Sequence, residues 1–162
     1  MTEDARKKRN TQRLAECFPV FAEKLEAVIE DVEKQGFRPR IQDAHRTIED
    51  QLKAFNNGFS MVKFGFHNVT GAGGKPEALA VDLLDDNKPL NPSREYLIRL
   101  AAAAEAHDLH TGIFFGLTSV TGLRQAIDTL DFNPLIKIGF DPTHVEVVGI
   151  TIAEAKAGKR PS

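Results

Sequence analysis

Residues 78–87, which read ALAVDLLDDN, decide the fold. An apolar run of this length that stops at an acidic turn is typical of a buried strand. Asp82 interrupts the run, and a carboxylate facing a core or cleft costs free energy unless it is paired or bound to a cation. Either Asp82 serves such a site, or it merely begins the acidic turn through Asp85 and Asp86.

The region before this strand predicts two helices and one extended segment. Apolar residues recur at steps of three and four from Leu14, through position 17 or 18, to Val32, which indicates an amphipathic helix. Pro19 either kinks that helix or begins its regular part, and Gly36 is a plausible end. We expect a short strand within 37–44 and a second helix over 47–55, with Thr47 as its N-cap.

The region after the strand predicts further mixed elements. We expect a glycine-rich loop at 69–77, and a helix capped by Asn91 with Pro92 in its first turn. Further on, residues 113–117, 136–138 and 144–148 are expected to be strands, 120–130 a weak helix and 152–156 a last helical turn. Because strands and helices mix without a regular βαβ alternation, the sequence predicts an α+β fold.

Length and charge limit the possibilities further. A chain of 162 residues with 41% hydrophobic residues favours one domain spanning 1–162, in which 1–12 form a frayed basic terminus and 157–162 a polar tail. The net charge of −2 gives no reason to expect nucleic acid or an anionic membrane as a partner. No apolar segment is long enough for membrane insertion, and the basic start lacks the apolar stretch of a signal peptide, so we expect synthesis in the cytoplasm.

Candidate chemistry gathers in three places. Residues 141–146 (DPTHVE) put a carboxylate three residues before His144, and strand periodicity puts His144 and Glu146 on one face. The second place is Asp82 with His67 upstream, and the third is residues 43–47 (DAHRT) followed by Gln51. Taken singly, these stretches would also fit a polar turn before an edge strand, an acidic turn and an ordinary surface arginine.

Together, the three places resemble the zinc D-alanyl-D-alanine carboxypeptidases and L-alanyl-D-glutamate endopeptidases that cut peptidoglycan. That family has Ser-Gly-Tyr-Arg-Ser, then Gln, then Ser-x-His-x-x-Gly-x-Ala-x-Asp, and finally Asp or Glu-x-x-His-x-Glu. Here Arg46 and Gln51 match the first elements, residues 80–82 match the end of the next, and residues 141–146 match the last. The resemblance runs from about residue 14 to 149.

The sequence also departs from the family pattern. His67 and Asp82 are further apart than in the family, and the extra residues fit an inserted glycine-rich loop at 69–77. Gly65 stands where the family has serine, and His45 stands where it has tyrosine. The family's tryptophan is missing, and Phe114 or Phe115 is a candidate to fill its place.

The resemblance implies a small, mainly antiparallel sheet with helices packed on it and a zinc cleft, as in the hedgehog-like DD-peptidase fold. It implies that Zn²⁺ is held by His67, Asp82 and His144, leaving a fourth position for water. Asp141 is then the general base and later acid, while Glu146 orients a metal histidine from the second shell. Arg46 binds a substrate carboxylate or the oxyanion, with Gln51 and His45 as further substrate-binding residues. We expect that His45, His107 and His110 are not metal ligands, and that His107 and His110 lie near the C-terminal end of a helix, where the helix dipole favours a cation.

By the same resemblance, the substrate is a peptidoglycan stem peptide, cut at the L-Ala–D-Glu bond or the D-Ala–D-Ala terminus. We favour the endopeptidase and expect a monomer. A compact chain of this kind resembles phage lysis enzymes, which reach the cell wall after another protein opens the membrane. Two alternatives remain: a zinc-binding but catalytically idle relative that serves as a cell-wall or protein-binding module, and an unrelated interaction domain.

Overall fold

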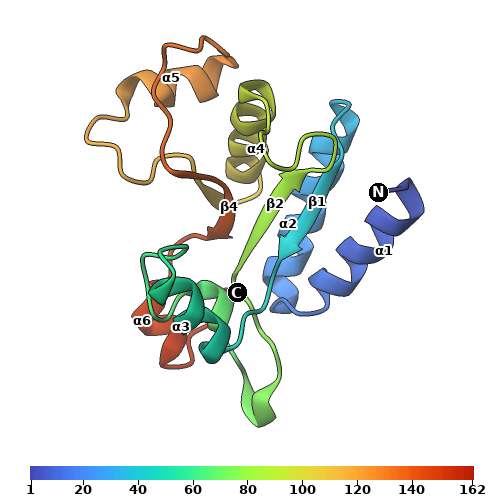
Figure 1. Cartoon of the computed structure of the whole chain (residues 1–162), viewed down its shortest axis with the longest axis vertical. Coiled ribbons are helices and arrows are strands. Elements are labelled where there is room, and N and C mark those ends of the chain that lie inside the picture. The colour runs from blue at the N-terminus through green and yellow to red at the C-terminus, as the bar shows by residue number, and fades with distance from the viewer.

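The computed structural model describes all 162 residues and shows a four-stranded sheet with helices around it (Figure 1). The helices and strands, together with two short 3-10 turns (η), are α1 (Glu3–Leu14), α2 (Pro19–Lys34), β1 (Pro39–Asp43), α3 (Ile48–Asn56), η1 (Phe66–Asn68), η2 (Ala72–Gly74), β2 (Ala80–Asp85), α4 (Arg94–Ala106), β3 (Leu109–Gly112), α5 (Thr121–Thr129), β4 (Asp141–Val147) and α6 (Ile152–Lys156).

The sheet has the strand order β1-β2-β4-β3, and every neighbouring pair is antiparallel. This confirms the α+β prediction with a small antiparallel sheet. The chain forms one cluster of buried apolar side chains, to which α2 and α4 contribute most of the helical residues. No helix is both long and apolar enough to cross a membrane.

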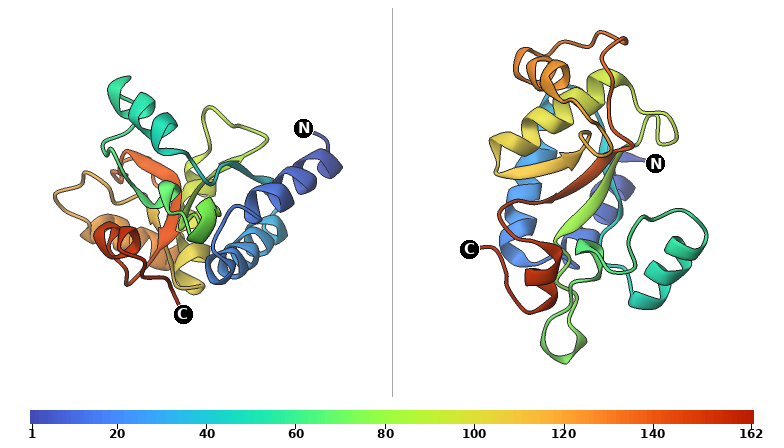
Figure 2. Two further views of the ribbon diagram at one scale, coloured as in Figure 1. Left: turned by 90° about the horizontal axis from the view of Figure 1, so that it is seen from below. Right: turned by 90° about the vertical axis from the view of Figure 1, so that its left-hand side faces the viewer.

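The two faces of the sheet differ in chemistry because strand side chains alternate. Val81 and Leu83 of β2 and Val145 of β4 are fully buried in the core. Asp82 and His144 alternate with them and therefore point to the opposite face, which is only partly covered. As Figures 1 and 2 show, α2 and α4 lie on one side of the sheet and α3 lies on the other. The face of β2 and β4 that carries Asp82 and His144 is therefore open enough to contain a functional site.

The prediction of a frayed N-terminus is wrong. Residues 3–14 form α1, which Thr2 caps, and the Arg6 side chain is only 1% exposed. Strand β1 is an edge strand, and side chains of α1 occupy its free backbone groups: Arg6 and Asn10 donate to the Pro39 carbonyl, and Asn10 also accepts from the amide of Ile41. The basic residues of α1 therefore cover an open sheet edge that would otherwise invite pairing with another chain.

Three local predictions also need correction. The cap of α4 is the Ser93 hydroxyl, which accepts from the amide of Tyr96, so the helix begins two residues later than expected from Asn91. Residues 113–117 form a turn after β3 rather than a strand, and 136–138 lie outside any strand. The turn at 113–117 is joined to the segment just before β4 by a hydrogen bond outside the sheet, in which the amide of Phe140 donates to the carbonyl of Phe115.

Other predictions of local structure are confirmed. Helix α2 begins at Pro19, so the proline starts a helix instead of kinking one. Gly36 follows its end with φ of 92°, a conformation that favours glycine. The Thr47 hydroxyl caps α3 by accepting from the amide of Asp50, and this cap fixes the start of the helix just after Arg46.

Candidate metal centre

The register of the sheet brings the acidic and histidine residues into one row. Asp82 on β2 pairs with His144 on β4 and, past a bulge in β1, with Asp43. Directly opposed residues on one face of a sheet lie within side-chain reach. Asp82 and His144 are separated by 62 positions in the sequence and are neighbours because their strands pair.

His67 reaches the same place from outside the sheet. It lies on η1, which backbone and side-chain hydrogen bonds fasten to the segment after β1: the His67 carbonyl accepts from the amide of Arg46, and Asn68 donates to the carbonyls of Arg46 and Thr47. Asn68 also accepts from the amide of Gly65. Asn68 is buried and fixes the turn, a role that no pattern in the sequence indicated.

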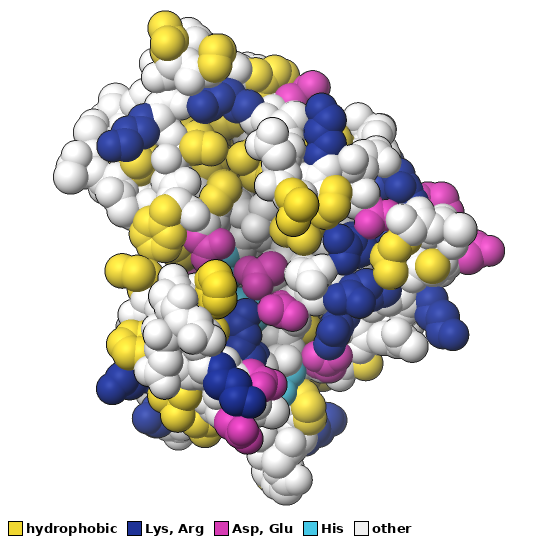
Figure 3. Space-filling view, viewed as in Figure 1, with side chains coloured by type: hydrophobic (Ala, Val, Ile, Leu, Met, Phe, Trp, Pro, Cys, Tyr) yellow, Lys and Arg dark blue, Asp and Glu magenta, His cyan; other side chains and the backbone are white.

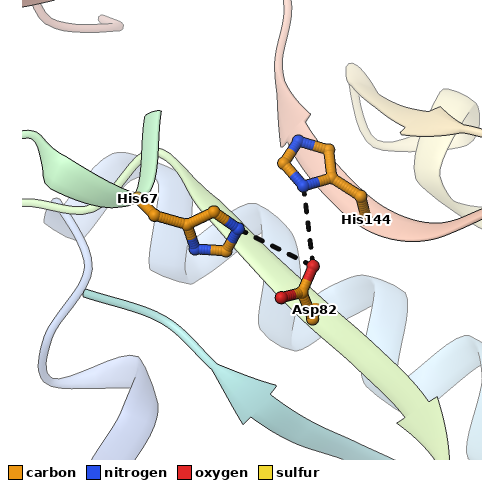
Figure 4. A group of neighbouring side chains, drawn as sticks. All are labelled: His67, Asp82 and His144. Atoms are coloured by element: carbon orange, nitrogen blue, oxygen red, sulfur yellow. Dashed lines mark ion pairs between the residues drawn. The ribbon is translucent and has the colours of Figure 1, made fainter. Parts of the chain in front are cut away.

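The three side chains converge without bonding closely to one another (Figure 4). Oδ1 of Asp82 lies 3.6 Å from Nε2 of His67 and 3.6 Å from Nδ1 of His144. These distances are longer than good hydrogen bonds. One ligand atom from each residue lies within 4.8 Å of the others, so the three can hold a metal ion. Three atoms that share a tetrahedral ion at about 2.0–2.1 Å are about 3.3 Å apart, close to this spacing.

Both imidazoles are oriented for such a role by a partner on their far side. Nδ1 of His67 lies 2.7 Å from the carbonyl of Ala44, and Nε2 of His144 lies 2.8 Å from Oε1 of Glu146. A ring nitrogen that donates its proton outward leaves the lone pair of the other nitrogen facing inward. Two imidazole nitrogens and one carboxylate oxygen are a donor set suited to catalytic zinc, so these residues fit the ion.

Asp82 and the facing histidines shift one another's pKa values. Burial would raise the pKa of Asp82, but the two facing imidazoles outweigh burial and hold it well below its usual value. Burial would lower the pKa of His144, but its contacts with Asp82 and Glu146 prevail and raise it to about 10. In the metal-free protein, His144 is therefore a cation between two carboxylates.

Asp141 lies beside this centre at the start of β4. Its Oδ2 is 3.9 Å from Nδ1 of His144, and the side chain is half-exposed. Burial raises the pKa of Asp141 above its usual value. Asp141 therefore occupies the border of the centre without belonging to the group of converging ligand atoms.

Arg46 lies on the other side of Asp82. Its Nη2 is 3.0 Å from Oδ2 of Asp43 and 3.8 Å from Oδ2 of Asp82, and its Nη1 donates to Oε1 of Gln51 at 2.9 Å. Asp43 is thus a counter-ion of Arg46 that the sequence analysis did not identify. Gln51 is only 2% exposed, and its amide group is used inside the protein.

The centre opens onto a cavity of about 770 Å³. Its lining includes His67, Asp82, His144, Asp141 and Arg46. In Figure 3, acidic and histidine side chains lie in a hollow at the middle of this face, with hydrophobic side chains beside it. Phe115 also lines the cavity, with its ring centroid 5.8 Å from that of His144, whereas Phe114 stacks on His110 instead. Of the two candidates for the missing tryptophan, Phe115 faces the centre.

The other histidines lie elsewhere. Nε2 of His45 contacts the hydroxyl of Thr70 at 3.0 Å, and His45 is not part of the cavity lining, contrary to the expected substrate contact. His107 follows the end of α4, as expected, and its Nε2 contacts Oδ2 of Asp31. His110 lies on β3 opposite Glu146, not at a helix end.

Comparison with known proteins gives structural similarity without a sequence match. No protein-family model matches the sequence, and a search of curated proteins finds no relative. Among solved structures, the crystal structure of Serratia marcescens L-Ala D-Glu endopeptidase ChiX is similar over 86% of both chains, with 13% identity and a TM-score of 0.49.

Proposed function

We propose that this protein is a zinc-dependent peptidase that hydrolyses peptidoglycan stem peptides. The observation that carries the proposal is the convergence of His67, Asp82 and His144 in one open cavity, with a carboxylate on one side and a guanidinium on the other. The choice of peptidoglycan rests on the order and spacing of the sequence motifs. Of the two bonds that fit, we favour the L-Ala–D-Glu bond over the D-Ala–D-Ala terminus.

The chain's own residues supply binding, orientation and proton transfer. When bound, the zinc ion would activate water and polarise the scissile carbonyl. Asp141, whose pKa burial raises, would accept the proton of the attacking water and donate it to the leaving amine. Arg46 would donate hydrogen bonds to the oxygen that gains negative charge, because its planar fork suits an oxyanion.

Two further residues keep these groups in place. Glu146 accepts from Nε2 of His144 and so holds the ring with Nδ1 toward Asp82. The Ala44 carbonyl does the same for His67 from the segment that also carries Arg46. The metal centre and the oxyanion donor are therefore fixed to the same turn, and a displacement of residues 44–47 would disturb both.

Digestion of purified peptidoglycan tests the proposal. Zinc-loaded protein is incubated with the polymer, and the products are separated and identified by mass spectrometry. We expect a new amino terminus on D-Glu for the endopeptidase, or free D-Ala for the carboxypeptidase, and neither product from protein stripped of zinc or from His144→Ala. A protein that binds zinc and leaves the polymer intact would be an idle binding module instead.

A further inference from the structure

Gln51 borders the cavity but is only 2% exposed, so its side chain is held inside the protein. Its amide makes three hydrogen bonds. Nε2 donates to the hydroxyl of Ser60 and to the carbonyl of Val62, both at 2.7 Å, and Oε1 accepts from Nη1 of Arg46 at 2.9 Å. Both hydrogens of Nε2 are therefore used, and no amide donor remains for a ligand.

These partners allow the amide of Gln51 only one orientation. A backbone carbonyl only accepts hydrogen bonds and a guanidinium only donates them, so the amide nitrogen must face Val62 and the oxygen must face Arg46. A flipped amide would place a donor against Arg46 and an acceptor against Val62. Gln51 is therefore a fixed acceptor that ties Arg46 to residues 60–62 of the cavity wall.

The guanidinium of Arg46 is held at both of its terminal nitrogens. Nη1 donates to Gln51, and Nη2 donates to Oδ2 of Asp43 at 3.0 Å. Of the five N–H groups of a guanidinium, these bonds leave three, including one on each terminal nitrogen, for a ligand in the cavity. The fork that suits an oxyanion or a carboxylate is therefore oriented before any substrate binds.

The same two bonds keep Arg46 apart from a candidate metal ligand. Nη2 of Arg46 lies 3.8 Å from Oδ2 of Asp82, which is too long for a hydrogen bond although the two groups carry opposite charges. The Asp82 side chain is only 23% exposed, so water screens this attraction poorly. A guanidinium that was free to turn would pair with Asp82 and compete with a metal ion for the carboxylate.

We propose that Gln51 is a positioning residue, which fixes the guanidinium of Arg46 toward the cavity and keeps it from pairing with Asp82. Its part in catalysis rests on the proposed function, whereas its effect on the metal centre requires no substrate. Without the Gln51 bond, only the contact with the half-exposed Asp43 remains, and the guanidinium can turn about it. The reaction then loses an oriented donor, and zinc loses part of a ligand.

Zinc affinity, measured by competition with a chelator, tests the effect on the metal centre. Gln51→Met is the test variant, because methionine fills a similar volume and makes none of the three hydrogen bonds. It should bind zinc about tenfold more weakly than the wild type. Adding Arg46→Ala should restore the affinity to that of Arg46→Ala alone, since no guanidinium then competes for Asp82. Unchanged affinity in Gln51→Met, or a loss that persists in the double variant, would overturn the proposal.

Three further variants identify which hydrogen bond matters. Gln51→Asn has a side chain too short to bridge Arg46 and Val62, so it carries the same expectation as Gln51→Met. Gln51→Glu retains the acceptor for Arg46 but loses the donor to Val62, so its melting temperature should fall while zinc affinity is kept. Gln42 also lines the cavity but accepts from Arg40, so Gln42→Met is the matched control and should keep zinc affinity. If Gln51→Glu or Gln42→Met weakens zinc binding as Gln51→Met does, the proposal fails.

Hydrolysis of a stem peptide at saturating zinc shows whether the oriented guanidinium serves the reaction. Gln51→Met should lower kcat by about tenfold or more with KM changed less, because a donor to the transition state is misplaced. In the Arg46→Ala background, the same substitution should change kcat by less than about twofold. Equal losses in the two backgrounds would overturn the positioning role. The expected zinc results without any hydrolysis by the wild type would reject the proposed function and keep the effect of Gln51 on Arg46.

Discussion

Zinc affinity should depend steeply on pH, because the ion must replace a proton on His144. Contacts with Asp82 and Glu146 overcome the effect of burial and raise the pKa of this imidazole to about 10. At pH 7.5 the group lies about 2.5 units below that value, and each unit corresponds to about 1.4 kcal/mol. Zinc binding at pH 7.5 should therefore be weaker by about 3 kcal/mol, or about 300-fold, than if the ring were already neutral.

Competition against a zinc chelator between pH 6.5 and 8.5 measures this effect. The apparent affinity should rise about tenfold per pH unit, and calorimetry in two buffers of different ionisation enthalpy should show about one proton released per zinc. Glu146→Gln is the matched control, since removal of one carboxylate lowers the pKa of His144 and should move the levelling of the profile to lower pH. A flat profile with no proton release would refute the reasoning.

The raised pKa of His144 also makes the stability of the metal-free protein decrease as the pH rises. The folded pKa of His144 is raised above its value in the unfolded chain, so the folded state binds the proton more tightly. The stabilisation is fully present below about pH 6.5, the unfolded pKa of histidine, and is lost as the pH rises through about 10. Denaturant unfolding of zinc-free protein at several pH values should follow this decline.

Three further results are expected. Asp141→Asn should keep zinc content and melting temperature, because this side chain is half-exposed, but lose about 10²-fold or more in hydrolysis; an active, destabilised variant would remove Asp141 from the mechanism. His144→Ala should lose the zinc-induced rise in melting temperature, which in wild type corresponds to about 2.7 kcal/mol at a hundredfold excess over Kd. Arg6→Met should cost about 2 kcal/mol in denaturant unfolding, because it removes a buried bond to the Pro39 carbonyl, and an unchanged midpoint would contradict the role of α1.

Local signals in the sequence were sufficient for much of the fold. Gly36 and Thr47 each act through their own backbone or the next turn, so the helix ends that they predicted are those found. For Pro19, the structure selects the start of a helix over a kink. The strand around Asp82 was predicted because its apolar run is bounded on both sides. The three candidate ligands were identified from motif order. Strand register explains why Asp82 and His144 meet, and the hydrogen bonds of the η1 turn bring His67 to them.

Apart from the cap of α4, the errors concern interactions between distant segments. The basic residues of α1 have partners on β1 and α2, including the Glu33 carboxylate for Arg6, and no local pattern predicts such contacts. The apolar residues after Gly112 follow a turn instead of a strand because the glycines there let two backbones approach closely. Gln51 matched a motif position, but only the fold shows that its amide is fully engaged.

Anomalous diffraction at the zinc edge, from crystals grown with one equivalent of zinc, tests the central claim most directly. The account predicts one peak per chain, within about 2.0–2.2 Å of Nε2 of His67, Oδ1 of Asp82 and Nδ1 of His144, with Asp141 outside the bonded group. A peak on other residues, or no peak between these three at full zinc loading, would contradict the account.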